Sequence, residues 1–255
     1  MSKGKYYRFP MAIASIFAIS GSLLAGCGET KQEEQSTKAE QKAVTQDTTE
    51  KKGTIPTTAT TDKKEQKVDA GGYIEGQKLP KKATYIQGIL IASKQYPLPA
   101  NFAPGENKDA RDAFNELNAA AALDGFKFDA FSKYRSYDRQ VELYDAYVKR
   151  DGKKAADTYS ARPGYSEHQT GLAFDIGEVG NTAAYADNKF ANTAAGKWIA
   201  KNAHKYGFIM RYPKGKDDVT GYMYESWHFR YVGKKIATEI YNNNETLEEY
   251  LGINK

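Results

Sequence analysis

Hydrophobic and polar positions divide the chain into three zones with different spacing. An apolar run at residues 11–25 follows three basic side chains, and residues 28–72 contain no aromatic side chain. From Tyr73 onward, apolar and aromatic residues recur at the intervals typical of helices and strands. The pattern therefore predicts an N-terminal leader, a polar linker and one folded domain at residues 73–255.

Helical spacing and capping signals predict five helices in the last zone. They are expected at residues 110–123, 136–150, 193–206 and 233–241, and in a short segment opening at Thr246. Ser136 is expected to cap the second helix, and Thr193 or Asn192 the third. Gly207 is expected to end the third helix, and the last segment opens with a capping-box pattern that includes Glu249.

Short apolar runs with β-branched and aromatic residues predict five strands. They are expected at residues 88–92, 126–134, 172–177, 208–212 and 227–232. The strands do not alternate regularly with the helices, so a doubly wound parallel sheet is not expected. The pattern indicates an α+β domain.

Charge and cysteine content exclude several classes of protein. Lysine and arginine total 37 against 32 acidic residues, a formal net charge of +5. Three of these basic residues lie in the leader, which leaves 34 against 32, or +2, for the rest of the chain. A balance so close to neutral argues against a nucleic-acid partner. A single cysteine excludes an intramolecular disulfide and a Cys-rich zinc ribbon. With three histidines in the chain, a metal site can have at most three histidine ligands.

The leader has the features of an export signal. Lys3, Lys5 and Arg8 precede an apolar run that ends in Leu-Ala-Gly-Cys27. This ending resembles the bacterial lipobox, in which the cysteine is acylated and becomes the new N-terminus. A plain signal peptide with an incidental Cys27 is the alternative. We expect residues 1–26 to be a lipoprotein signal peptide, with Cys27 anchoring the protein to the outer face of the bacterial cytoplasmic membrane.

The segment after the cysteine is expected to be a disordered tether. Residues 28–72 hold ten threonines and few large aliphatic side chains. Such a composition cannot bury enough apolar area to offset the entropy of ordering. The predicted tether, residues 27–72 with its acylated cysteine, would let the following domain reach material above the membrane, such as a cell wall.

Candidate chemistry appears first in the segment from Ser166 to Gly177. Its second half alternates apolar residues with small residues and Asp175. On a strand, this alternation gives one core face and one open face that carries the carboxylate. His168 precedes the strand on a loop, where a bend can return its side chain over the open face.

The second candidate segment runs from Glu225 to Tyr231, with the sequence Glu-Ser-Trp-His-Phe-Arg-Tyr. In an extended chain, His228 and Arg230 share one face, while the aromatic residues between them share the core face. Glu225 has the wrong parity for the face of His228. The two can work in one site only if the backbone bends near Ser226.

Two imidazoles and a carboxylate suit Zn²⁺ with a fourth position left for water. Zinc lowers the pKa of such a water toward about 7. An unligated carboxylate, for which Glu225 is the candidate, can then carry the proton to a leaving amine. Taken from the residues alone, the alternative that His168 and His228 are hydrogen-bonded loop residues remains open.

The two segments together resemble the zinc D-alanyl-D-alanine carboxypeptidases of the VanY type and their L,D-carboxypeptidase relatives, which trim peptidoglycan tetrapeptides. The resemblance rests on Ser166-x-His-x-x-Gly-x-Ala-x-Asp175 and on Glu225-x-Trp-His228, within longer matching strings at residues 161–171 and 224–233. Residues 96–99 and 134–136 add to it, and it covers roughly residues 85–255. Ser226 departs from the proline that relatives often carry, which removes a backbone restraint.

The resemblance implies a central, mostly antiparallel sheet flanked by helices. It also implies that His168, Asp175 and His228 ligate zinc and that Glu225 is the catalytic base.

Further roles follow from the same resemblance. Arg135, together with Gln140, is implied to bind substrate or to polarise the scissile carbonyl, and which of these tasks Arg135 performs is open. Ser166 is a candidate hydroxyl partner for the substrate, with a loop hydrogen bond as the alternative. His204, Arg211 and Arg230 are expected to serve the scaffold, or the rim of the site in the case of the arginines.

The expected function is removal of the terminal D-alanine from peptidoglycan stem peptides, with D,D- and L,D-specificity left open. Two alternatives remain, an endopeptidase of the same polymer and a non-catalytic wall-binding module. An intact Glu225 argues against the module, which does not need a base beside the metal ligands. We expect a monomer whose partners are stem peptides and, through the lipid anchor, a membrane.

Overall fold

The computed structural model describes residues 67–253, so the predicted leader with Cys27 and the predicted tether up to residue 66 lie outside the described residues. In this part of the chain, none of the helices has the length and apolar character needed to span a membrane. The strands are β1 (Thr84–Ile86), β2 (Ile89–Ile91), β3 (Phe128–Ser132), β4 (Ala173–Glu178), β5 (Phe208–Met210) and β6 (His228–Tyr231). The helices are α1 (Lys108–Leu123), α2 (Tyr137–Asp151), α3 (Lys153–Tyr159), α4 (Ala194–Asn202), α5 (Asp217–Thr220), α6 (Lys234–Asn243) and α7 (Leu247–Leu251). Short 3-10 helices are η1 (Glu167–Thr170), η2 (Thr182–Ala184), η3 (Asn188–Asn192) and η4 (Ala203–Tyr206).

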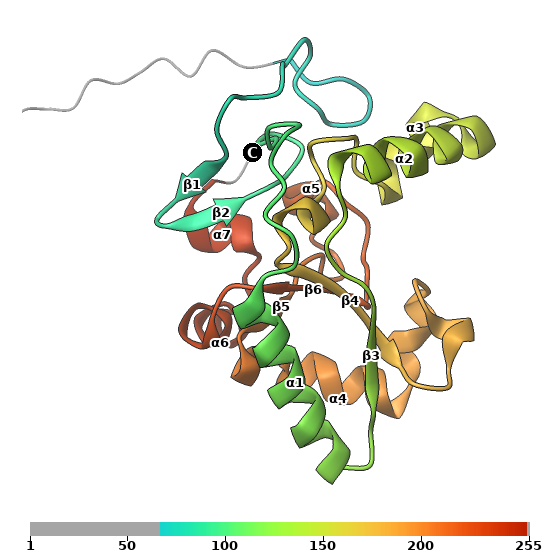
Figure 1. The fold of residues 1–255 in the computed structure, drawn as a ribbon, viewed down its shortest axis with the longest axis vertical. Helices are drawn as coiled ribbons and strands as arrows, with labels where there is room; N and C mark the ends of the chain where they lie inside the picture. The colour runs from blue at the N-terminus through green and yellow to red at the C-terminus, as the bar shows by residue number, and fades with distance from the viewer. Residues whose placement is uncertain (1–66, 254–255) are drawn as a thin grey trace, which may run out of the picture. The chain divides into compact units, whose positions relative to one another are not determined.

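A four-stranded antiparallel sheet lies at the centre, in the order β3-β4-β6-β5 (Figure 1). A separate antiparallel hairpin is formed by β1 and β2. The register places Asp175 of β4 opposite His228 of β6, and Ala173 opposite Arg230. The predicted α+β class with a central antiparallel sheet and flanking helices is therefore confirmed.

One face of the sheet is the main core. Phe174 and Ile176 of β4 and Phe229 of β6 are fully buried there. They pack with apolar side chains of α1 and α4, which lie together on one side of the sheet in Figure 1. Fully burying a side chain of this size stabilises a fold by about 1.5–3 kcal/mol. The predicted core faces of both candidate segments are confirmed.

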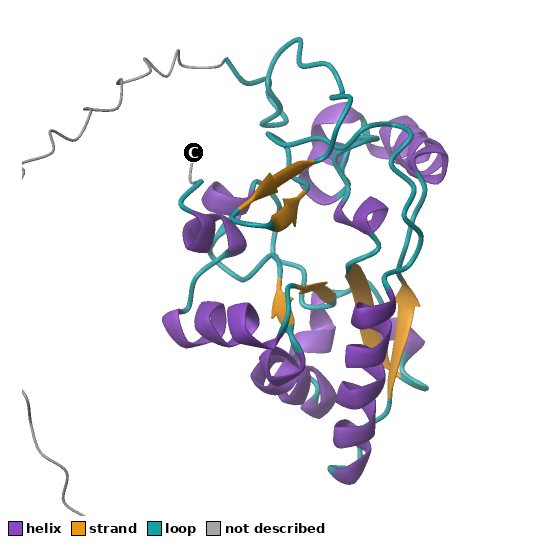
Figure 2. Ribbon diagram, turned by 60° about the vertical axis from the view of Figure 1, so that its left-hand side comes forward, coloured by secondary structure: helices purple, strands orange, loops and turns teal. Residues whose placement is uncertain are grey.

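The opposite face of the sheet has two parts. At the β5 edge, Ile209 clusters with Ile91 of β2 and with residues of α6 and α7 such as Ile240. Nearer to β3, the same face carries Asp175 and His228. In Figure 2, helices lie both below the four-stranded sheet and above it.

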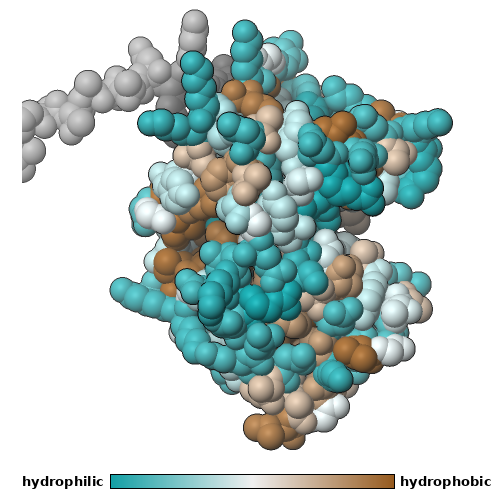
Figure 3. All heavy atoms as spheres, viewed as in Figure 1, coloured by the Kyte–Doolittle hydropathy of each residue, from teal (hydrophilic) through white to brown (hydrophobic). Residues whose placement is uncertain are grey.

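Apolar side chains also line a surface groove between the hairpin and α6, among them Ile89, Leu172 and Ile236. In Figure 3, hydrophobic residues gather over this part of the molecule, while most of the remaining visible surface is hydrophilic.

The capping signals in the sequence are reproduced in the structure. The hydroxyl of Ser136 accepts a hydrogen bond from the Arg139 N–H at the start of α2, and that of Thr193 from the Gly196 N–H at the start of α4. Thr246 forms the complete capping box at α7. The sequence did not predict β1, α3 or α5, each too short to show a hydrophobic period.

The N-terminal boundary of the domain lies earlier than predicted. Asp69 forms an ion pair with Arg162 at 2.7 Å, and its carboxylate accepts a hydrogen bond from the Gly71 N–H at 2.9 Å. Val68 also forms a β-bridge with Ile74. The assignment of residues 67–72 to a disordered tether is therefore wrong, because polar contacts rather than aromatic residues hold this segment on the domain.

Candidate active site

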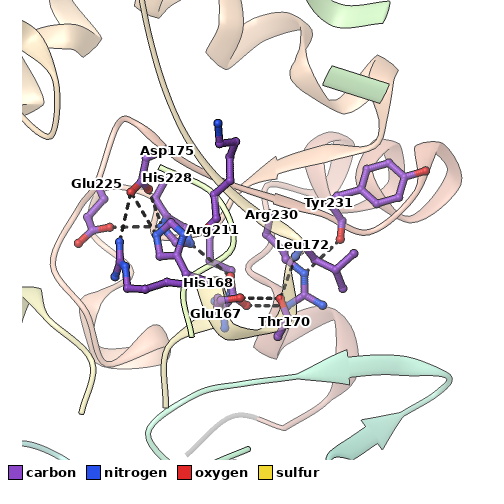
Figure 4. Close-up of polar contacts among 12 residues, drawn as sticks. Glu167, His168, Thr170, Leu172, Asp175, Arg211, Glu225, His228, Arg230 and Tyr231 are labelled. Carbon is purple, nitrogen blue, oxygen red and sulfur yellow. Dashed lines mark hydrogen bonds and ion pairs between the residues drawn. The ribbon is translucent and has the colours of Figure 1, made fainter. Parts of the chain in front are cut away.

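Asp175 lies between two histidines in the middle of the sheet. Its Oδ1 is 3.0 Å from Nδ1 of His228, its partner in the β4–β6 ladder. Its Oδ2 is 3.1 Å from Nε2 of His168. The two imidazole rings meet edge to face, with their centroids 4.9 Å apart. Figure 4 shows the three side chains converging on one point.

A left-handed turn brings His168 to this point. His168 lies in η1, which ends at Gly171 with φ of 71°, a conformation that favours glycine. A side chain at Gly171 would also collide with the backbone of Gly105. The Arg135 N–H donates to the His168 carbonyl oxygen at 3.1 Å and so fixes the same turn. The predicted return of His168 over the open face of β4 is confirmed.

The second nitrogen of each imidazole also has a partner. Nδ1 of His168 is 2.7 Å from the Lys133 carbonyl oxygen, so it must carry the proton and leaves Nε2 free to ligate. Nε2 of His228 is 3.4 Å from an oxygen of Glu167. Such outer partners fix the ring orientation and tautomer of histidines that ligate metals.

The geometry of the three residues fits a metal ion. One ligating atom each from His168, Asp175 and His228 can be chosen so that all lie within 4.8 Å of one another, and all three residues are buried. Two neutral nitrogens and one carboxylate oxygen form a donor set that suits Zn²⁺ with one position open.

Glu167, which the sequence analysis did not single out, is completely buried behind His228. Its Oε1 accepts from Arg211 Nε at 2.7 Å and from Arg230 Nη1 at 2.8 Å. Arg211 in turn donates to both carboxylate oxygens of Glu248 in α7. Burial alone would raise the pKa of Glu167, but the two guanidinium groups and His228 hold it well below its usual range.

These contacts refine the expected roles of the two arginines. Arg211 and Arg230 serve the scaffold, as expected, but both are about 1% exposed and neither lies on a rim. No local sequence pattern identifies this network, because Glu167 is 44 residues from Arg211 and 63 from Arg230.

Glu225 reaches the site through a turn. The His228 N–H donates to the Glu225 carbonyl oxygen at 3.3 Å, which closes a turn over Ser226 and Trp227. The predicted bend near Ser226 is confirmed. The Glu225 carboxylate lies 3.8 Å from Nδ1 of His228 and is mostly buried. Burial is the main cause that raises its pKa to about 8, and the neighbouring Asp175 adds to the shift.

Their surroundings shift the pKa values of the two histidines in opposite directions. Burial lowers the pKa of His168. Burial acts on His228 in the same direction, but hydrogen bonds with Asp175 and Glu167 outweigh it and raise its pKa to about 9. Burial opposes ionisation of Asp175, yet the two imidazoles hold its pKa well below its usual range. Metal ligation requires a neutral imidazole, so it would displace a proton from His228.

The comparisons with known proteins agree with this geometry. The family model described as VanY, D-alanyl-D-alanine carboxypeptidase, matches residues 105–234. The chain belongs to this family. The putative carboxypeptidase YodJ of Bacillus subtilis strain 168 is 38% identical over 269 residues, covering 97% of this chain and 96% of the relative. A D-alanyl-D-alanine carboxypeptidase of Enterococcus faecalis is 35% identical over 185 residues, 66% of each chain.

Solved structures show the same VanY-type fold. The LdcB LD-carboxypeptidase matches with a TM-score of 0.59 and 40% identity, over 68% of this chain and 94% of that one. The L,D-carboxypeptidase DacB of Streptococcus pneumoniae matches with 0.57 and 46%, over 65% and 87%. A mutant of the vancomycin-resistance D,D-pentapeptidase VanY, in complex with Zn(II), matches with 0.55 and 35%, over 63% and 97%. The protein is thus a carboxypeptidase of the type that acts on D-Ala-D-Ala and peptidoglycan peptides.

In this VanY-family chain, Arg135 lies beside the three converging residues. Its Nη2 is 4.0 Å from Asp175 and donates to Ser132 Oγ at 3.0 Å. Its Nη1 donates to the Gln140 side-chain oxygen at 2.9 Å. The Gln140 amide nitrogen donates to the Ala161 carbonyl oxygen at 2.6 Å. Because both ends of this buried amide are occupied, the geometry supports a role for Gln140 in holding Arg135 rather than in contacting substrate.

The remaining candidates differ in their contacts. Among the described residues, the hydroxyl of the buried Ser166 has no hydrogen-bond partner, so the loop bond considered as its alternative role is not formed. His204 stacks on Tyr241 with ring centroids 3.8 Å apart and takes no part in the His-Asp-His group. Tyr212, which the sequence analysis also missed, packs its ring 4.9 Å from that of His228.

Proposed function

We propose that the protein is a zinc-dependent carboxypeptidase that removes the terminal D-alanine from peptidoglycan stem peptides in cell-wall maturation. The observation that carries the proposal is the buried convergence of His168, Asp175 and His228, with Glu225 beside them but outside the donor set. The VanY relative solved with Zn(II) supports the choice of metal. When bound, Zn²⁺ supplies Lewis-acid activation of a water nucleophile near neutral pH.

In this proposal, Glu225 carries the proton. Its carboxylate is held at the edge of the site, where burial raises its pKa in the metal-free protein to about 8. A group with such a pKa can accept a proton from water and donate it to the leaving amine. A wall-binding module has no use for a buried carboxylate in this position, so the geometry favours an enzyme.

Arg135 is proposed to recognise the end of the substrate. Gln140 and Ser132 occupy two of the five N–H donors of its guanidinium, so donors remain for a carboxylate or a carbonyl oxygen. A fixed guanidinium binds a terminal carboxylate and also stabilises a developing oxyanion. The free hydroxyl of Ser166 is proposed as a further contact to the peptide.

The comparisons favour L,D-specificity, which means removal of D-alanine from tetrapeptide stems. Identity to the solved L,D-carboxypeptidases LdcB and DacB is 40% and 46%, against 35% for the D,D-pentapeptidase VanY. D,D-specificity is the second candidate, because the matching family model and the Enterococcus faecalis relative are described as D-alanyl-D-alanine carboxypeptidases.

We also propose that the enzyme works outside the cytoplasm, anchored by an acylated Cys27 to the outer face of the cytoplasmic membrane. The support is the basic n-region, the apolar run and the Leu-Ala-Gly-Cys27 ending. The polar segment that follows would give the enzyme reach into the wall, and a monomer suffices because the site is built from one chain.

The test compares defined peptides and one variant. The zinc-loaded protein is incubated with tetrapeptide stems, pentapeptide stems and crosslinked dimers, and products are identified by mass spectrometry. We expect release of D-alanine from the tetrapeptide and intact crosslinks. Glu225→Ala should retain zinc and the fold but lose 10²–10⁴-fold or more of its turnover. Loss of zinc from this variant would make Glu225 a ligand, and cleavage of crosslinks would indicate the endopeptidase.

A further inference from the structure

The side chain of Asn188 holds the backbone on both sides of Glu225. Its amide nitrogen donates to the Tyr224 carbonyl oxygen at 2.8 Å. Its amide oxygen accepts from the Ser226 N–H at 3.0 Å. Asn188 is half-buried and is the first residue of η3. It lies 36 residues before Tyr224, so this contact joins two segments that are distant in the sequence.

Glu225 needs such external support. Among the residues that the structure describes, no side chain forms a hydrogen bond with its carboxylate, and the nearest charged partner is His228 at 3.8 Å. Its orientation therefore depends on the backbone. The Glu225 N–H donates to the Tyr212 carbonyl oxygen at 3.2 Å, and its own carbonyl oxygen closes the turn to His228. The two bonds to Asn188 flank Glu225 directly.

We propose that Asn188 is a positioning residue, whose amide clamps the turn and so aims the Glu225 carboxylate at the substrate. This inference rests on the proposed role of Glu225 as proton carrier. A primary amide presents a donor and an acceptor side by side and can therefore bind a carbonyl and an N–H of the same backbone stretch. A displacement of about 1 Å at a catalytic group is enough to cost up to 100-fold in rate.

A purely local role for Asn188 in η3 is not what the contacts show. The start of η3 is already capped by Asp187, whose carboxylate accepts from the Lys189 N–H at 2.8 Å. Both side-chain hydrogen bonds of Asn188 lead away from η3 to the Glu225 turn.

The first experiment measures Asn188→Ala in the zinc-loaded enzyme. We expect kcat to fall about tenfold, within the range for two lost hydrogen bonds, while KM stays within about twofold and zinc content is unchanged. The matched control is Asn192→Ala, at the exposed other end of η3, which should leave kcat unaltered. A full kcat in Asn188→Ala would overturn the proposal.

A double-mutant cycle then separates positioning from general stability. Ser226→Pro removes the N–H that Asn188 accepts from, and proline is favoured at the second position of a β-turn. If the clamp acts through that N–H, Asn188→Ala should lower kcat only about threefold in the Ser226→Pro background, instead of about tenfold in the wild-type background. Equal fold losses in both backgrounds would mean independent effects and would refute the clamp.

Asn188→Asp provides a variant that does not depend on the proline. It keeps the acceptor for Ser226 but places a carboxylate oxygen against the Tyr224 carbonyl oxygen in place of a donor, so its kcat should fall at least as far as that of Asn188→Ala. Hydrogen exchange gives a readout besides activity, since the Ser226 amide should exchange faster in Asn188→Ala. Unchanged exchange would contradict the clamp.

Failure of this inference is distinct from failure of the proposed function. If Glu225→Ala remains active, the proton carrier lies elsewhere and the proposed function fails. If Glu225→Ala is inactive while Asn188→Ala keeps full kcat, only the clamp is wrong.

Discussion

Replacing Glu167 by glutamine tests whether the buried charge network supports the metal site. The substitution keeps the shape of the side chain and removes its charge. The Glu167 side chain is fully buried and has three charged or titratable partners, at 2.7 Å from Arg211, 2.8 Å from Arg230 and 3.4 Å from His228. Glutamine with its oxygen at the Oε1 position can still accept from both arginines, but it no longer neutralises the charge of Arg230, and an amide nitrogen replaces the oxygen that faces His228.

The expected loss of stability follows from these contacts. Removing one partner of a buried ion pair costs about 3–5 kcal/mol, because it leaves an uncompensated charge. The retained oxygen places Glu167→Gln near the lower end, at about 3 kcal/mol. For a domain of this size, that corresponds to a decrease in Tm of roughly 6–12 °C. Because the neutral amide no longer orients the His228 ring in the same way, zinc affinity should fall about 10–100-fold.

The measurements are thermal unfolding and competitive zinc titration on the same preparation. Glu116→Gln is the matched control, since its ion pair with Lys234 is more than half exposed on both sides and its loss should change neither quantity measurably. Unchanged zinc affinity in Glu167→Gln would refute the outer-partner role, and an unchanged Tm would refute the buried network.

The pH dependence of this difference has a definite sign. The pKa of Glu167 is held below its usual range, so its contribution to stability is present above its unfolded pKa near 4.3. It is lost as the pH falls toward the folded pKa. The difference in Tm between wild type and Glu167→Gln should therefore be full at pH 7 and shrink below about pH 4. A difference that persists undiminished at pH 3 would contradict the charge-based explanation.

Further predictions concern protons and anchoring. In metal-free protein the pKa of Glu225 is raised to about 8, so the folded state holds a proton that the unfolded state releases near pH 4.3. The free energy of unfolding that this group contributes therefore falls as the pH rises between these two values. In denaturant titrations, the stability of Glu225→Gln relative to wild type should increase with pH up to about pH 8. Parallel curves of unfolding free energy against pH for the two proteins would contradict the pKa shift. Because the pKa of His228 is raised to about 9, zinc uptake at pH 7 should release at least about one proton, measured by calorimetry in buffers of different ionisation enthalpy. No proton release would show that His228 is already neutral. Cys27→Ala should abolish acylation and release the protein from membranes, and a wild-type protein without lipid would refute the anchor.

The sequence predicted the strands and helices that carry a clear period. The core face of β4 was readable because Leu172, Phe174 and Ile176 alternate with small residues, and capping residues such as Ser136 marked helix starts. Short elements such as β1 were missed, since three residues show no period. The predicted boundary at residue 72 was wrong because Asp69 contacts Arg162, a residue 93 positions away in the sequence. The composition of a local segment contains no information about such a contact.

The same distinction between local and distant information applies to the site. Parity on a strand was enough to place Asp175 and His228 on one face and to require a bend before His228. Parity does not reveal which distant groups lie behind an imidazole. Glu167 lies inside the first motif, but its role depends on its contacts with Arg211, directly after β5, and Arg230 in β6. Local spacing in the sequence gives no information about these two contacts.

The contacts behind His228 extend beyond the residues that match the family model. The matching family model ends at residue 234, whereas Glu248 lies in α7 and binds Arg211 with both carboxylate oxygens. Arg211 holds Glu167, which faces His228. Charges in a buried chain of this kind interact strongly because little water screens them. The C-terminal helix α7 is thus connected to His228 through Glu248, Arg211 and Glu167, although it contains neither motif.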